Sequence, residues 1–161
     1  MADDKLEVIN PPNNLKQKVG TGGAGAVDLE ALERAEQVIT GMTDSYLEWV
    51  AEDLKKIDQA YAKLAAATGD RKEEMEAVFH ISHDIKGQGG SFGYDLMTAI
   101  ANELCRLIEK AEKIGDEEVE AVKLHIASLK LVIGEDMKGQ GGQAGEKMLA
   151  GLQQVCDKLL A

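Results

Sequence analysis

The spacing of its apolar residues constrains the fold of this 161-residue chain more than any other feature. From Leu47 to Leu64 the apolar side chains recur at alternating intervals of three and four residues, which places them on one face of an α-helix. We call such a one-sided apolar face a seam, and similar seams follow at residues 96–111, 119–133 and 148–160. Both prolines precede residue 13, so none interrupts these segments, and no segment alternates like a β-strand. The sequence therefore predicts an all-α protein.

Breaks between the seams divide the chain into six expected helices. Asp28 is a suitable N-cap for a short helix through Val38, and Gly41 is expected to end that helix. Further helices are expected from Thr43 or Asp44 to about residue 67, at about 71–89, around 96–111, from Asp116 to Ile133, and after a glycine-rich break at 139–145. The second to fifth helices are predicted to form an antiparallel four-helix bundle, with additional N-terminal and C-terminal helices.

The first 27 residues differ in character from the remainder. They lack helical periodicity and include the glycine-rich run from Gly20 to Gly25, so we expect a tail and linker at 1–27 and one bundle domain at 28–161. Part of this tail could nevertheless dock onto the domain as an extended strap through its apolar residues Leu6, Val8, Ile9, Leu15 and Val19.

Charge and composition exclude several classes of function. With 18 Lys and Arg against 29 Asp and Glu, the formal net charge is −11, which argues against binding nucleic acid or an anionic membrane surface. No long apolar run suggests a signal peptide or a membrane span, so we expect a cytoplasmic protein. Cys105 and Cys156 stand among leucines at helical spacing and are interpreted as small buried residues in a reducing compartment.

A histidine, a lysine and several glycines converge in the expected third helix. At 100° per residue, His83, Lys86, Gly87 and Gly90 share one flank of that helix, beside its apolar face. Glycine within a helix lowers helix stability by about 1 kcal/mol relative to alanine, so two glycines on one face require an explanation. One reason is close approach of another protein to His83. The alternative is that the helix ends at Gly87 and the later glycines form a loop.

The order of residues around His83 resembles the histidine-containing phosphotransfer (HPt) domain. The resemblance rests on His83-Asp84-Ile85-Lys86-Gly87, on Phe92-Gly93, and on the downstream residues Leu96, Leu104, Cys105, Leu107, Ile108 and Glu109. It covers about residues 75–111. Ile85, Phe92 and Ile108 stand where leucine is commoner in the family, and Gln88-Gly89-Gly90 replaces a triplet that usually contains serine.

The resemblance implies a phosphoryl carrier in a two-component phosphorelay, free-standing and without a cofactor of its own. It implies that His83 accepts the phosphoryl group and that the ammonium of Lys86 offsets the phosphoryl charge. Gly87, Gln88, Gly90 and His80 would contact the partner. The partners would be receiver domains of a hybrid sensor histidine kinase or a response regulator, which supply the aspartate and the Mg²⁺. The family resemblance also favours a monomer.

Other interpretations of these residues remain open. No Gly-x-x-x-x-Gly-Lys-[Ser/Thr] loop is present, so we expect no ATP-dependent kinase activity and no enzyme in that sense. A non-phosphorylated helical adaptor could bind a receiver through the same face. A metal-dependent enzyme using His80, His83 and Asp84 is a more remote alternative. The one other histidine, His125, is interpreted as a residue at the edge of the bundle and not as a metal ligand.

A short sequence occurs twice. Lys86-Gly-Gln-Gly-Gly90 recurs as Lys138-Gly-Gln-Gly-Gly142, but Glu135 occupies the position that matches His83. The second copy therefore carries no histidine acceptor. Duplication of an ancestral hairpin and chance recurrence in a glycine-rich chain both remain possible, and the sequence assigns no role to this copy.

Overall fold

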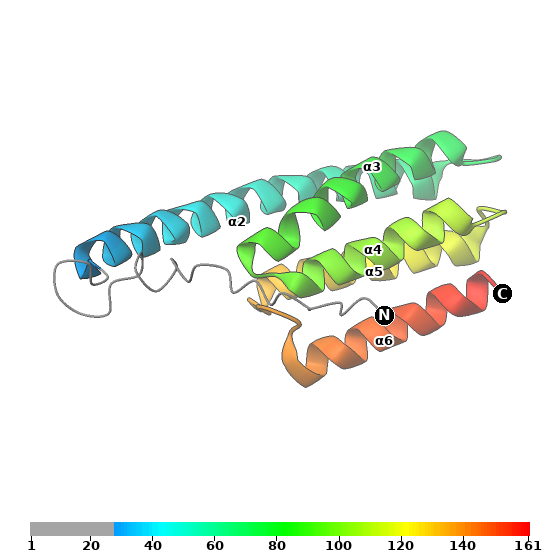
Figure 1. The fold of residues 1–161 in the computed structure, drawn as a ribbon. Helices are drawn as coiled ribbons and strands as arrows, with labels where there is room; N and C mark the ends of the chain where they lie inside the picture. Colours follow the sequence, from blue (N-terminus) through cyan, green and yellow to red (C-terminus); the bar gives the residue numbers. More distant parts are fainter. Residues whose placement is uncertain (1–27) are drawn as a thin grey trace, which may run out of the picture. The chain divides into compact units, whose positions relative to one another are not determined.

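A computed structural model describes residues 28–161, and all their regular structure is helical. The helices are α2 (Leu29–Ala66), α3 (Lys72–Gly89), α4 (Asp95–Lys110), α5 (Asp116–Gly134) and α6 (Gly142–Leu159), with the 3-10 turn η1 (Gly90–Phe92) between α3 and α4. The chain divides into two compact units, Met1–Gly41 and Met42–Ala161. Within the second unit, successive helices run in opposite directions (Figure 1). The predicted all-α fold and antiparallel bundle are confirmed.

The apolar seams from residue 46 onward meet in one core. Fully buried side chains come from every helix of the second unit, and include Tyr46, Ile57, Leu64, Val78, Ile100, Leu104, Val122, Leu129 and Cys156. An aromatic group closes one end of this core, where the ring of Tyr46 stacks on Phe92 at 4.7 Å and lies 5.5 Å from Tyr94. Burial of these seams is the main source of stability for the bundle.

The expected break at Gly41 is wrong. Residues 29–66 form one continuous helix, so the predicted N-terminal helix is the first part of α2. The cap at Asp28 is confirmed, because its carboxylate accepts a hydrogen bond of 3.0 Å from the backbone N–H of Glu30. A single glycine costs about 1 kcal/mol in a helix, which the cooperative propagation of neighbouring turns can outweigh.

Arg71 connects the α2–α3 loop to the start of α5. Its guanidinium donates to the carbonyl oxygen of Ala67 at 3.0 Å and to the carboxylate of Asp116 at 3.1 Å. The residue takes a left-handed backbone conformation with φ of 56°, which turns the chain from α2 into α3. Helices α2, α3 and α5 are thereby joined at this end of the bundle.

Two glycine-containing loops pair at the opposite end. The N–H of Gly139 donates to the carbonyl oxygen of Gly93 at 2.6 Å, and the N–H of Leu96 donates to that of Gly139 at 2.8 Å. The phenol of Tyr94 also donates to the carboxylate of Asp136 at 2.6 Å. The second Lys-Gly-Gln-Gly-Gly copy is therefore a structural loop between α5 and α6.

The expected break at 139–145 is too long, because α6 begins at Gly142. Gly145 lies inside this helix and is buried. A Cβ at this position would clash with the carbonyl oxygen of Gln140, so the close approach of loop and helix requires glycine here.

His125 lies inside the protein, so its predicted position at the bundle edge is wrong. Its Nδ1 lies 2.7 Å from the carbonyl oxygen of Ala121, which can only accept, so Nδ1 carries the proton. Its Nε2 then accepts from the thiol of Cys156 on α6, at 3.5 Å.

A second polar contact holds α6 in place. Arg106 on α4 forms an ion pair of 2.9 Å with Asp157 on α6. Polar contacts therefore join α6 to both α4 and α5.

Both cysteines are buried and unpaired, as the sequence predicted. Burial raises the pKa of the Cys105 and Cys156 thiols to about 11, so both remain protonated at neutral pH.

No helix among residues 28–161 is long and apolar enough to cross a membrane. The expected tail lies outside the described residues, with its docking residues Leu6, Val8, Ile9, Leu15 and Val19.

Candidate functional site

His83 lies on the exposed side of α3, in the second turn from its C-terminal end. The opposite face of the helix is buried through Met75, Val78, Ser82, Ile85 and Gly89. This apolar spacing orients α3 and so directs the imidazole outward. The ring of Phe79, one turn earlier, lies 6.0 Å from the imidazole at 38° and supports it from one side. The imidazole of His83 is thus accessible to solvent on a helix whose opposite face is buried.

Lys86 follows His83 by three residues and is half-buried. This spacing places its ammonium on the same side of the helix as the imidazole. Burial raises the pKa of the Cys105 thiol on α4, and the positive charge of Lys86 acts in the opposite direction. A cation in this position can offset part of the charge of a phosphoryl group on His83.

Thr98 of α4 binds the last turn of α3. Its hydroxyl donates to the carbonyl oxygen of Lys86 at 3.0 Å and accepts from the N–H of Gly90 at 2.9 Å. The N–H of Gly90 also points toward the carbonyl oxygen of Gln88, so Thr98 adds a contact from α4 to those that the backbone of this helix end makes itself. This contact could not be predicted from the sequence, because a single threonine carries no information about its partner.

The three glycines near His83 have different roles. The helix continues to Gly89, so the alternative that it ends at Gly87 is wrong. Gly87 is exposed, and a Cβ there would meet nothing within 4 Å. A Cβ on Gly89 would lie 2.8 Å from Thr98 Oγ1 and 2.9 Å from the Tyr94 carbonyl oxygen. Gly89 therefore allows α3 and α4 to approach closely, whereas Gly87 leaves open space beside His83.

The remaining predicted contact residues do not all share the His83 face. Gly90 is exposed and lies just beyond the end of α3, where its Cβ would have ordinary contacts of 3.5 Å and more. His80 is exposed and lies 3.6 Å from the carboxylate of Glu76. Gln88 follows His83 by five residues, which turns it about 140° away around the helix. The structure thus groups His83, Lys86 and Gly87, with Gln88 on the opposite flank.

Among residues 28–161, no group of three or more His, Cys, Asp or Glu side chains could hold a metal ion. The described residues thus offer His80, His83 and Asp84 no further ligands with which to form a metal centre. All three side chains are exposed on α3.

The antiparallel bundle thus presents an exposed histidine on α3, with a half-buried lysine three residues later and an open glycine beside it. The sequence model of the Hpt domain matches residues 41–132, which is more than half of the chain. The chain belongs to the Hpt-domain family, whose members take part in two-component phosphorelay signalling and carry phosphoryl groups. Searches of curated proteins and of solved structures returned no significant match.

Proposed function

We propose that this protein carries a phosphoryl group between receiver-domain aspartates and that His83 is the acceptor. The observation that carries the proposal is the exposed imidazole on α3, with Lys86 three residues later and open space at Gly87. The matched Hpt domain supports a phosphotransfer role and includes all of these residues.

The proposed transfer conserves its atoms and charges. A ring nitrogen of His83 attacks the phosphorus of a receiver aspartyl phosphate, so that an N–P bond forms and the acyl O–P bond breaks. The aspartate leaves as a carboxylate, and the imidazole loses its N–H proton to water. The reverse reaction passes the phosphoryl group to a second receiver. Mg²⁺ on the receiver and Lys86 on this protein share the charge of the phosphoryl oxygens.

The partners in this proposal are receiver domains of a hybrid sensor kinase and of a response regulator. The protein would act as a monomer in the cytoplasm and would not use ATP itself. Gly87 and Gly90 would admit the receiver surface, and His80 would lie near the rim of the contact.

The proposal is tested by incubating the full chain with a panel of receiver domains that carry labelled aspartyl phosphate. We expect transfer from at least one receiver, and the label should be acid-labile and base-stable, as a phosphohistidine is. His83→Gln should abolish the label and leave the helical content unchanged. His80→Gln removes the other exposed histidine of α3 and should still accept the label, even if its position near the rim of the contact makes transfer slower. Glu120→Gln, an exposed change away from α3, is the control for an unchanged rate.

Label that persists in His83→Gln would overturn the assignment of the acceptor. Receiver binding without any label on the unmodified protein would instead support a non-phosphorylated adaptor that uses the same face.

A further inference from the structure

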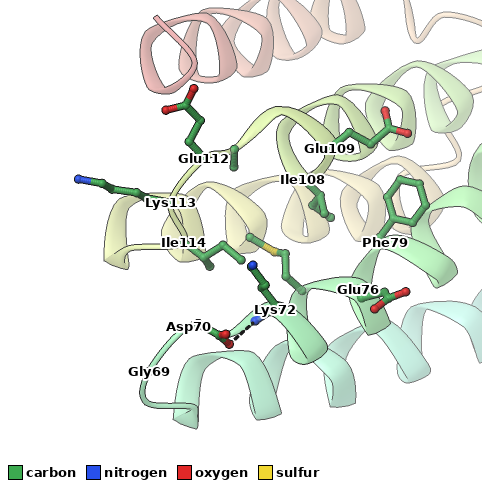
Figure 2. A pocket seen from close by; sticks show the side chains of 12 residues that line it. Gly69, Asp70, Lys72, Glu76, Phe79, Ile108, Glu109, Glu112, Lys113 and Ile114 are labelled. Carbon is green, nitrogen blue, oxygen red and sulfur yellow. Dashed lines mark hydrogen bonds between the residues drawn. The ribbon is translucent and has the colours of Figure 1, made fainter.

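An open groove lies between α3 and α4, close to His83. It encloses about 500 Å³, and its apolar lining includes Met75, Phe79, Ile108 and Ile114. Figure 2 shows these helices on either side of the groove, with Ile108 and Ile114 turned toward it. Phe79 belongs both to the groove and to the site, because its ring contacts the imidazole of His83. The groove is therefore continuous with the surface around the proposed acceptor.

The end of the groove nearest His83 carries negative charge. Glu76 from α3 and Glu109 from α4 lie on either side of Phe79 (Figure 2). Within residues 28–161, Glu109 has no ion-pair partner, and Glu76 has only the exposed imidazole of His80 at 3.6 Å. Lys72 and Lys113 line the other end together with Asp70 and Glu112. The end nearest His83 thus combines an aromatic side chain with two carboxylates, neither of which forms an ion pair with a lysine or arginine of residues 28–161.

A receiver that reaches His83 has a contact area large enough to include this groove. A typical protein interface buries about 800 Å² on each partner, equivalent to a disc of radius roughly 16 Å. Phe79 and Met75 lie one and two turns from His83, or about 6 and 12 Å along the helix. Unless the contact is displaced toward α2, the receiver must cover the groove.

We propose that the groove between α3 and α4 receives an apolar side chain of the receiver domain, next to a receiver lysine or arginine that pairs with Glu76 and Glu109. This inference rests on the proposed function and names the chemistry of the partner surface. Apolar burial in the groove provides affinity, while the carboxylates select receivers with a cation at the matching position.

The experiment compares receiver binding and phosphotransfer for the unmodified full chain and for Glu76→Lys, Glu109→Lys and Ala111→Leu, the last of which narrows the groove. Glu120→Lys is the matched control, because Glu120 is also exposed on a helix but lies beside α6. Phosphoramidate, a small phosphoryl donor, measures the reactivity of His83 without docking. Circular dichroism confirms that each variant is folded.

We expect each groove variant to weaken binding and transfer by about fivefold to tenfold, with a smaller salt dependence for the two charge reversals. Glu120→Lys should match the unmodified chain, and all variants should react equally with phosphoramidate. Normal transfer in the three groove variants would overturn the inference and leave the proposed function standing.

A second possible contact lies on α2, where Trp49 is 54% exposed and packs against Phe92. If Trp49→Ala impairs transfer and the groove variants do not, the receiver docks toward α2 and the inference is wrong. If the unmodified chain accepts no phosphoryl group from any receiver, the proposed function fails, and this inference fails with it.

Discussion

The hydroxyl of Thr98 on α4 donates a hydrogen bond of 3.0 Å to the carbonyl oxygen of Lys86 on α3. The hydroxyl oxygen of Thr98 also accepts a hydrogen bond of 2.9 Å from the N–H of Gly90, so this one side chain contacts an acceptor and a donor at the end of the helix that carries His83. Thr98 therefore helps to position the end of α3 and the lysine beside the proposed acceptor.

Thr98→Val should destabilise the protein by about 1–2 kcal/mol, because it removes both hydrogen bonds and keeps the shape of the side chain. Urea denaturation measures the change. Thr98→Ser retains the hydroxyl, so its loss of stability should be clearly smaller than that of Thr98→Val. Equal losses in the two variants would show that the methyl group of Thr98, and not its hydroxyl, stabilises this contact.

Alanine substitutions at Gly87 and Gly89 should have effects of opposite sign. Gly87→Ala should stabilise the protein by about 0.5–1 kcal/mol, since the new methyl group meets only open space and alanine favours the helix. Gly89→Ala should destabilise it by about 1–3 kcal/mol, because the methyl group would press on Thr98 and the Tyr94 carbonyl. Thermal unfolding of both variants checks the signs, and a shift of the same sign in both would contradict the assigned packing.

Tyrosine-to-phenylalanine substitutions should likewise separate two buried phenols. Tyr94→Phe should lower the free energy of unfolding by about 1–3 kcal/mol, because it removes a charge-assisted hydrogen bond to Asp136. Tyr46→Phe should leave stability unchanged or raise it by about 1 kcal/mol, since within residues 28–161 the buried hydroxyl of Tyr46 has no hydrogen-bond partner. Denaturant unfolding tests both, and a large loss in Tyr46→Phe would reveal a partner for that hydroxyl.

The same two phenols should make the protein less stable in alkali. Burial raises the pKa of Tyr46 and of Tyr94 to about 12, and the hydrogen bond to Asp136 adds to the rise at Tyr94. Between pH 10 and 12 the folded state holds more protons than the unfolded state, so the free energy of unfolding should fall as pH rises. Tyr94→Phe should reduce this slope, and an unchanged slope would contradict the raised pKa.

His125 should give a pH dependence on the acidic side. Burial lowers its pKa from the ordinary value of 6.5, despite the hydrogen bond to Ala121. Below pH 6.5 the unfolded chain binds a proton that the folded protein resists, so stability should fall as pH decreases from there toward the folded pKa. Unfolding free energies between pH 7.5 and about 5 measure the slope. In His125→Gln this slope should be smaller than in the unmodified chain, whatever the stability of the variant at neutral pH.

Some elements of this protein could be predicted from the sequence and others could not. The seam from Leu47 to Leu64 was sufficient to predict a helix, because contacts between residues three and four apart are local. Gly41 was misinterpreted because a single unfavourable residue competes with the stability of the turns around it, and a local signal cannot weigh that balance. His125 was misplaced because its burial depends on α6, which follows it by many residues.

The sequence by itself determined that this protein is helical, that its helices pair through apolar seams, and that His83 and Lys86 share a helix face. These properties follow from the period of the α-helix and from the order of residues in a short motif. Tertiary structure alone decided that Thr98 binds the end of α3, that Gly139 pairs with Gly93, and that an acidic groove opens beside Phe79. Each of these features joins residues from different helices or loops, and chain packing, which no local pattern encodes, brings them together.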